Sequence, residues 1–474
     1  MRPSITHRKR VVAASLLLSA LLLAAAACSD SDSAAPPADA SPGADLGGDA
    51  TPDLARRDAA RPDGPAPDLL PPGPYVVDPS TLDRKVMFGY QGWFACPGDG
   101  VVDRWRHWFG GQTSSATEAT FDAWPDLGEL TPAERCPTDM QRKGGGAAYL
   151  FSSARRPTVL RHFKWMADHD LDGVFLQRFV SELGDPTALA MRDAVTGHVR
   201  AGAETHGRVF ALMYDVSGAG EAGLFDALKS DWAHLVDDLG VTQSARYLRH
   251  GGRPVLGLWG LGFPSRPGTP ALAQTIIDWF RKDAPQRLRA TLVGGVPHHW
   301  RTRDGDAKPE PAWDSVYRSY DVVSPWAVGA FVDDAGADVF RKDRIEPDMA
   351  ALAGGSASYM PVVFPGFSWA NLMSGSPLNQ IPRRGGRFYW HQVFNVIDAG
   401  VTMIYVAMFD EVDEGTAMFK IAPTQADVPT SGSWLTLDAD GQSLPSDFYL
   451  RLGRATGRTL RGQLRLERTL PQNP

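Results

Sequence analysis

Two glutamates three residues apart are the strongest candidates for chemistry in this sequence of 474 residues. Glu411 and Glu414 lie in an acidic run, DEVDE, that directly follows an apolar segment. Cleavage of a glycosidic bond needs one carboxylic acid to protonate the departing oxygen and a second carboxylate on the other side of the anomeric carbon. Repulsion between close carboxylates would raise one pKa and keep that group protonated near neutral pH.

The same run has two other interpretations. It could be a solvated acidic turn or the start of a helix, where negative charge is favourable, and composition alone leaves these interpretations and the catalytic one about even. A calcium-binding loop is a weaker alternative, because the spacing does not match the D-x-D-x-D-G pattern.

Aromatic and polar residues gather at the ends of several other short apolar segments, and the sequence holds 14 tryptophans. Sugar rings present an apolar C–H face to an aromatic ring and hydroxyls to polar groups, so such a set is what a carbohydrate site requires. Any one tryptophan is better explained by core packing, but the coincidence of several favours a site. The predicted substrate-binding residues are Tyr90, Trp93, Gln177, Arg178, Tyr214, Asp215, Trp259, Trp300, Arg301, Trp326 and Trp369.

A neighbouring pair of histidines, His298 and His299, raises the question of a metal ion. Adjacent residues on a strand face opposite sides of a sheet, so we expect the two rings to point apart and predict no metal site. We also predict no cofactor.

The elements that must position these residues alternate between β-rich runs and helical patterns. The runs at 86–94, 173–179, 209–214, 254–259, 290–296, 321–326, 359–364 and 401–409 are mostly continuous in apolar residues, as in strands covered on both faces. Helical periodicity separates them, with a helix closed by Gly207 and another that starts at Thr269-Pro270. This alternation predicts a (β/α)₈ TIM barrel with elaborated βα loops, in which reactive groups stand at the carboxyl ends of the strands.

A doubly wound open sheet is the second choice for the fold, although no glycine-rich phosphate loop follows the first strand. The stretch 95–158 is too long for a simple crossover and predicts a decorated loop over the site. The apolar residues between 448 and 460 predict a closing helix.

The first 72 residues predict export and anchoring. Residues 1–28 combine a basic start, a short apolar run and Cys28 in a lipobox-like context, which predicts a lipoprotein signal peptide; an ordinary cleaved signal is the alternative. Residues 29–72 are almost entirely Ala, Pro, Asp, Gly and Ser and predict a disordered tether. The catalytic domain would then span 73–474, on a monomer held at the bacterial cell envelope, periplasmic or at the cell surface, by its N-terminal lipid.

The remaining cysteines and the charge balance agree with an exported protein that acts on carbohydrate. With Cys28 lipidated, Cys96 and Cys136 remain for one disulfide in an oxidising compartment; two separate buried thiols are the alternative. The formal net charge of −7 leaves no basic excess to neutralise phosphates, so we expect no nucleic-acid partner and a polysaccharide or glycan as substrate.

One resemblance narrows the prediction. The segment EVDEGT at 411–416 resembles the E-W-H-E-G-T signature of glycoside hydrolase family 99, the endo-α-mannosidases. The segment GYQGWF at 89–94 and residues 161–179 resemble the wider family 71/99-like group, and the similarity covers residues 80–465. It implies that Glu411 is the base that deprotonates the sugar 2-hydroxyl, giving a 1,2-anhydro intermediate and overall retention. Glu414 would be the general acid and then the base for water.

The departure from that signature lies between the two glutamates, where Val412 and Asp413 replace Trp and His. Because these side chains would lie beside the substrate, we expect the change to alter the preferred sugar rather than the fold or the reaction type. The leading hypothesis is a surface-anchored, endo-acting, retaining glycosidase on α-linked glycans such as α-mannan. An α-1,3-glucanase of the family 71 type and a glycan-binding lipoprotein without catalysis are the alternatives.

Overall fold

The computed structural model describes residues 75–472 and 474, so the predicted signal peptide, Cys28 and the tether lie outside the described residues. Nine parallel segments form the central sheet, in the order β10-β9-β8-β7-β5-β4-β1-β12-β11. Their bounds are β1 Val86–Tyr90, β4 Gly173–Phe179, β5 Val209–Asp215, β7 Arg253–Trp259, β8 Thr291–Val296, β9 Val322–Pro325, β10 Ser358–Tyr359, β11 Val362–Val363 and β12 Ile404–Val406.

The two ends of this order are halves of one strand, and they close the barrel. β10 pairs with β9, β11 pairs with β12, and only Met360 and Pro361 separate β10 from β11. The chain therefore changes neighbour within a few residues, at a proline that has no N–H to give to a ladder. Eight predicted strands are present, the seventh in two pieces, and the (β/α)₈ prediction is confirmed. The open doubly wound sheet is excluded by the closure.

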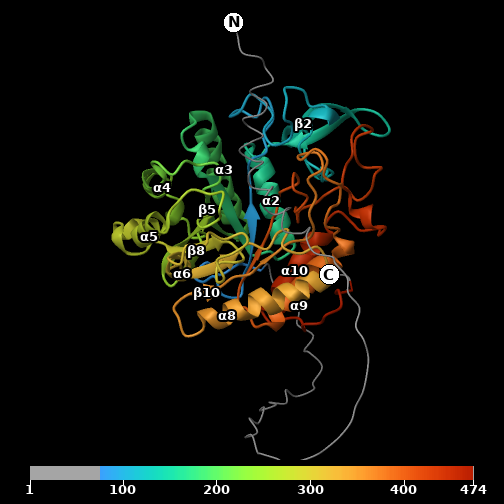
Figure 1. Cartoon of the computed structure of the whole chain (residues 1–474). Helices are drawn as coiled ribbons and strands as arrows, with labels where there is room; N and C mark the ends of the chain where they lie inside the picture. Colours follow the sequence, from blue (N-terminus) through green and yellow to red (C-terminus); the bar gives the residue numbers. More distant parts are fainter. Residues whose placement is uncertain (1–74, 473) are drawn as a thin grey trace, which may run out of the picture.

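Helices surround the sheet (Figure 1). Their bounds are α2 Arg156–Asp168, α3 Pro186–His206, α4 Leu224–Ala233, α5 Pro270–Asp278, α6 Trp313–Arg318, α7 Asp334–Phe340, α8 Glu346–Leu352, α9 Arg387–Asp398 and α10 Phe448–Leu460. The two helix boundaries predicted from the sequence are present. Gly207 ends α3 in the left-handed conformation, and the Thr269 side chain accepts from Leu272 N–H at the start of α5. No helix between residues 75 and 472 is long and apolar enough to span a membrane.

The stretch 95–158 is more ordered than a decorated loop. It contains an antiparallel hairpin of β2 (Arg135–Gln141) and β3 (Ala147–Phe151), and a short strand β6 (Arg249–His250) pairs with β7 elsewhere. In Figure 1 the arrow of β1 points toward the end of the barrel where β2 lies. Cys96 and Cys136 form a disulfide whose Cα atoms are 6.3 Å apart, so the hairpin is tied to the segment that leaves β1.

Candidate active site

The alternation of side chains along each strand decides which candidate residues face the barrel interior. Gln177 of β4 faces inward, where its Nε2 donates to Tyr405 Oη at 3.0 Å. Its neighbour Arg178 faces the helices, where its Nε and one terminal nitrogen each donate to Asp231 at 2.6 Å. Successive strand residues point to opposite faces, so a pair of adjacent candidates supplies one group to the interior and one to the helix layer.

Five of the predicted binding residues instead have structural roles. Tyr90 Oη lies 2.9 Å from His162 Nδ1 of α2, and Tyr214 Oη donates to Asp231 at 2.6 Å. Arg178 is held by the same aspartate. Trp300 is fully buried, and its Nε1 donates to Asp348 at 2.9 Å. A fifth, Arg301, binds the other oxygen of Asp348 at 3.0 Å and helps to fix that carboxylate.

Glu411 lies on the loop that follows β12 and is held by two donors. Gln91 Nε2 donates to its Oε1 at 2.6 Å, and Thr416 Oγ1 donates to its Oε2 at 2.6 Å. Burial and the nearby Glu414 raise the pKa of Glu411 well above its ordinary value, while these two hydrogen bonds act in the opposite direction. Both oxygens thus face groups that stabilise a carboxylate and fix its orientation.

Glu414 differs from Glu411 in its surroundings. It is partly exposed, and no hydrogen bond from the described residues reaches its carboxyl group, although its backbone oxygen accepts from Ser368 N–H at 2.9 Å. Burial raises the pKa of Glu414 to about 7. A carboxyl group with this pKa is protonated in a large share of molecules near neutral pH, as a general acid must be.

The loop that carries both glutamates is fixed by its own backbone and by Arg383. Thr416 N–H donates to Glu411 O at 3.1 Å, which closes a turn that places the two carboxyl groups on one loop. The buried Arg383 donates to the carbonyl oxygens of Gly415 and Ala417 at 2.8 and 2.7 Å. The loop is thus held at its far end by a charged donor from outside it.

Asp410 joins this loop to the end of β1. Its two oxygens accept from the N–H groups of Gln91 and Gly92 at 2.7 and 2.9 Å. Burial raises the pKa of Asp410 to about 6. The contact sets the position of Gln91, which in turn orients Glu411.

The two residues between the glutamates do not share one role. Val412 is fully buried, and its carbonyl oxygen accepts from Asp122 and Ala123 N–H. The expectation that both intervening side chains lie beside the substrate is thus wrong for Val412. Asp413 is also buried, with Oδ2 3.8 Å from His107 Nδ1 and with Oδ1 lacking a protein partner. Burial and the two glutamates raise the pKa of Asp413 well above its usual range.

Aromatic rings form one wall beside this loop. Trp93 stacks on His107 with ring centres 4.0 Å apart and on Phe179 at 5.3 Å. Burial lowers the pKa of His107 to about 3, so this ring is neutral at physiological pH. The stack begins at the end of β1 and reaches the end of β4.

A second aromatic group lies at the ends of β7 and β9. Trp259 stacks on Phe263 at 4.9 Å and meets Trp326 edge to face at 5.4 Å. The Arg266 guanidinium lies 5.5 Å from the Trp259 ring centre. A β-carbon on Gly295 of β8 would lie 2.2 Å from the Trp259 ring, so the ring occupies its place only because that position is a glycine.

Asp215 lies at the end of β5, next to β7. Its Oδ1 accepts from Ser217 N–H at 2.7 Å. Burial raises the pKa of Asp215, whereas the positive charge of Arg266 lowers it. Asp215 and Arg266 thus add opposite charges near the Trp259 group.

The stretch 95–158 reaches the loop of the seventh strand through Asp122. Its Oδ2 accepts from Ser368 Oγ and Ala370 N–H at 2.5 and 2.7 Å, and its Oδ1 accepts from Asn371 N–H at 2.8 Å. These contacts hold the loop that carries Trp369. Ser368 N–H also binds the backbone of Glu414, so the loops of strands one, seven and eight form one connected rim.

Several polar atoms at this end of the barrel are buried without a protein partner. They are Gln91 Oε1, Trp93 Nε1, Trp259 Nε1, Trp369 Nε1 and Asp413 Oδ1. Buried donors and acceptors favour hydrogen-bonded partners. A ligand with several hydroxyl groups, each both donor and acceptor, fits such a set.

Among the residues of this arrangement that were not predicted as site residues are Gln91, Thr416, His107 and Arg266. Strand alternation was the available signal for Gln91, since it has the parity of the inward residues Gln177 and Tyr405, whereas Tyr90 does not. Thr416 was visible within the EVDEGT segment. His107 and Arg266 come from irregular loops, and no local pattern marks them.

The comparisons with known proteins address the fold. No family model matches the sequence, and no curated protein is significantly similar to it in sequence. Among solved structures, the GH99 endo-α-mannosidase of Bacteroides thetaiotaomicron matches with a TM-score of 0.57 and 14% identity, over 81% of this chain and 99% of that chain. The chain has the same fold as that enzyme. A glycoside hydrolase-like protein also matches, with a TM-score of 0.50 and 13% identity, over 82% of this chain and 97% of that one.

Proposed function

We propose that the protein is a retaining glycoside hydrolase that acts on α-linked glycans such as α-mannan. The observation that carries the proposal is the contrast between two carboxyl groups on one loop. Glu411 accepts a hydrogen bond on each oxygen, whereas no hydrogen bond from the described residues reaches the carboxyl group of Glu414. Burial raises the pKa of both groups, that of Glu414 to about 7. A base and an acid in one site need such different surroundings. The fold shared with a GH99 endo-α-mannosidase supports the proposal.

The mechanism divides the work between these two groups. Glu411, held by Gln91 and Thr416, would take the proton from the 2-hydroxyl of the sugar, and the resulting oxygen would attack the anomeric carbon to form a 1,2-anhydro sugar. Glu414 would give its proton to the departing oxygen in the same step. It would then take a proton from water as water opens the anhydro ring, while Glu411 returns its proton to the 2-oxygen and restores the hydroxyl. Two inversions at the anomeric carbon give retention.

The aromatic walls would supply most of the binding. A sugar ring that stacks on the partly exposed Trp259 would bury its C–H face, while its hydroxyls would reach the unpaired indole N–H groups and Asp413 Oδ1. Asp413 adds an acceptor directly between the two glutamates. We expect Asp413 to have the largest influence on which sugar is preferred.

A product screen tests the function. The wild-type chain and the double variant E411Q/E414Q are incubated with α-mannans, α-glucans and arabinoxylans, and released sugars are separated by size. The proposal expects products from an α-linked substrate with the wild type only. Oligosaccharides rather than monosaccharides would show endo action. Tight binding without products from any substrate would favour a glycan-binding protein instead.

The pH profile follows from the raised pKa of Glu414. Its proton is needed in the first step, so we expect kcat/KM to fall as the pH rises through about 7, where this carboxyl group ionises. A pH series on a substrate with a natural leaving group measures this fall in kcat/KM.

The raised pKa of Glu414 also affects stability. The contribution of this group to stability is greatest below its ordinary pKa of 4.5 and is lost as the pH rises through about 7.

The glutamine variant at position 414 is the control for that profile. E414Q has no proton to lose, so its residual activity should lack the decline near pH 7. An E414Q profile that declines as the wild type does would show that another group controls the alkaline side.

We also propose that the protein is exported and held at the cell envelope by a lipid on Cys28. The support is the sequence around Cys28 and the composition of residues 29–72, both outside the described residues. The variant C28A should move from the membrane fraction to the soluble fraction, with C96A as a comparison that removes a cysteine elsewhere. Unchanged partition of C28A into the detergent phase would contradict the anchor.

A further inference from the structure

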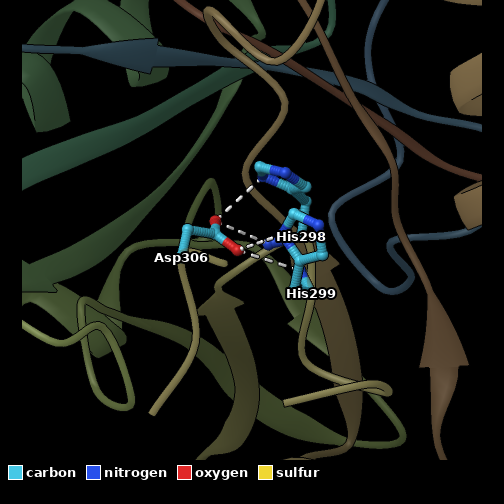
Figure 2. A group of neighbouring side chains, drawn as sticks. All are labelled: His298, His299 and Asp306. Atoms are coloured by element: carbon cyan, nitrogen blue, oxygen red, sulfur yellow. Dashed lines mark hydrogen bonds and ion pairs between the residues drawn. The ribbon is translucent and has the colours of Figure 1, made fainter. Parts of the chain in front are cut away.

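A cluster of two histidines and one aspartate lies outside the proposed catalytic site. Figure 2 shows His298, His299 and Asp306, which come from the loop 297–307 that follows β8. Asp306 Oδ2 lies 2.9 Å from His298 Nδ1, and Asp306 Oδ1 lies 2.8 Å from His299 Nδ1. One nitrogen or oxygen from each of the three residues lies within 4.8 Å of the others.

The expectation that the two rings point apart is wrong, because the residues do not belong to the strand. β8 ends at Val296, and the chain turns at once: Trp300 N–H donates to Pro297 O at 3.1 Å. In a turn the alternation of a strand no longer applies. Both rings therefore reach the same carboxylate.

The backbone holds this arrangement in place. The N–H groups of His298 and His299 donate to the two oxygens of Asp306, each at 3.0 Å. Gly305 has a φ of +50°, and a β-carbon there would lie 2.7 Å from the His299 ring. Main-chain hydrogen bonds thus bring the three side chains together. The positive φ of Gly305 and the nearby His299 ring both favour glycine at that position.

The charged groups around the cluster are compatible with a bound cation. Asp304 Oδ1 lies 3.9 Å from His299 Nε2 on the exposed side. The nearby cations are engaged elsewhere, with Arg301 on Asp348 and Arg303 3.3 Å from Asp314. The side chains of the three ligands are between 11% and 19% exposed, so an ion could enter and keep a water ligand.

We propose that His298, His299 and Asp306 bind a divalent first-row transition-metal ion of the zinc class. Imidazole nitrogens with one carboxylate suit zinc and its neighbours, whereas Ca²⁺ and Mg²⁺ prefer oxygen ligands. Zinc bonds of about 2.1 Å in tetrahedral geometry place ligand atoms about 3.4 Å apart. The contacts of 2.8–2.9 Å seen here would open by about half an ångström to admit the ion, with Asp304 or water as a further ligand.

The place of the cluster points to a positioning role for the ion. β8 lies between β7 and β9, whose ends carry Trp259 and Trp326, while β12 and the glutamates lie beyond β9, β10 and β11 in the ring. Directly after the loop, Lys308 N–H donates to Gly262 O, and its Nζ donates to the carbonyl oxygen of Arg266 at 2.9 Å. An ion that fixes loop 297–307 thus also fixes the segment beside Trp259.

Metal binding by the protein, with any affinity tag removed, tests the proposal. After treatment with a chelator, the protein is titrated with Zn²⁺ by calorimetry and with Co²⁺ by visible absorption. We expect one equivalent of each ion and a Co²⁺ spectrum of nitrogen and oxygen ligation. H299A should remove the binding, and D306N should weaken it by about tenfold or more.

The matched control is H391A, since His391 Nε2 contacts Asp338 at 2.7 Å as a single histidine–aspartate pair. It should leave the affinity unchanged. Circular dichroism and melting without metal show whether H299A and D306N stay folded, and H298Q provides a milder change at the cluster. Absence of saturable binding at micromolar metal, or binding that survives in H299A, H298Q and D306N alike, would overturn the proposal.

Discussion

Replacement of Glu411 by glutamine is expected to reduce the hydrolysis of every substrate by about 10²- to 10⁴-fold, the range for loss of a general base or acid. The formation of a 1,2-anhydro sugar requires removal of the 2-hydroxyl proton whatever the leaving group is. A natural glycan and a glycosyl fluoride should therefore lose rate to a similar extent. Steady-state kcat/KM for both substrates, with wild type and E411Q side by side, measures the effect.

A surface change provides the control for Glu411. Glu204 lies near the end of α3, where it binds Arg200 and Ser244 far from the strand ends that carry the site, and E204Q should keep full activity. Substrates modified at the 2-position give an independent check, because a 2-deoxy sugar has no hydroxyl to deprotonate and should resist the wild-type enzyme. A stable covalent adduct between a 2-fluoro sugar and Glu411 would contradict the anhydro route and indicate direct attack by the carboxylate.

The barrel could be predicted because its strands are buried on both faces. Continuous apolar runs such as 209–214 and 254–259 marked strands that the structure also has, within a residue or two. The runs overestimated strands one and eight, since β1 ends at Tyr90 and β12 spans only Ile404–Val406. The residues beyond those ends form loops whose groups bind one another, as in the contact of Asp410 with Gln91 and Gly92.

The candidate site could be predicted only by region. The sequence indicates where the strands end, but the polar and aromatic residues at those ends point to both faces of the sheet. Tyr214 and Arg178 both bind Asp231 in the helix layer, whereas Gln177 binds Tyr405 in the interior and Asp215 has the same strand parity as Gln177. The two-residue period of a strand would have separated them.

Contacts between distant loops lay beyond what the sequence could reveal. Asp122 binds Ser368 and Asn371, some 250 positions later in the chain, and no local pattern links them. The same holds for His107, which meets Asp413 from the stretch that follows β1. The histidine cluster was not predicted for another reason. His298 and His299 lie in a turn after β8, where side chains do not alternate between two faces as they do on a strand.

Replacement of Glu414 by glutamine is expected to separate substrates by their leaving groups. The acid assists most when the departing oxygen is a poor leaving group, so E414Q should cleave a natural glycan about 10²- to 10⁴-fold more slowly than the wild type. A glycosyl fluoride needs much less protonation and should lose far less rate. The ratio of the two losses, measured as kcat/KM near pH 6, is the diagnostic quantity.

Stability gives the second measurement for E414Q. Folding raises the pKa of Glu414 to about 7, which means that the folded chain holds the ionised form poorly. At pH 8 glutamine removes that buried charge, so E414Q should melt at a higher temperature than the wild type, while below pH 5 the two should melt alike. If Glu414 lowers the stability of the fold but supplies the proton for catalysis, E414Q should combine slower hydrolysis with greater stability. Equal losses on both substrates, together with a lower melting temperature at pH 8, would instead assign Glu414 a structural role in its loop.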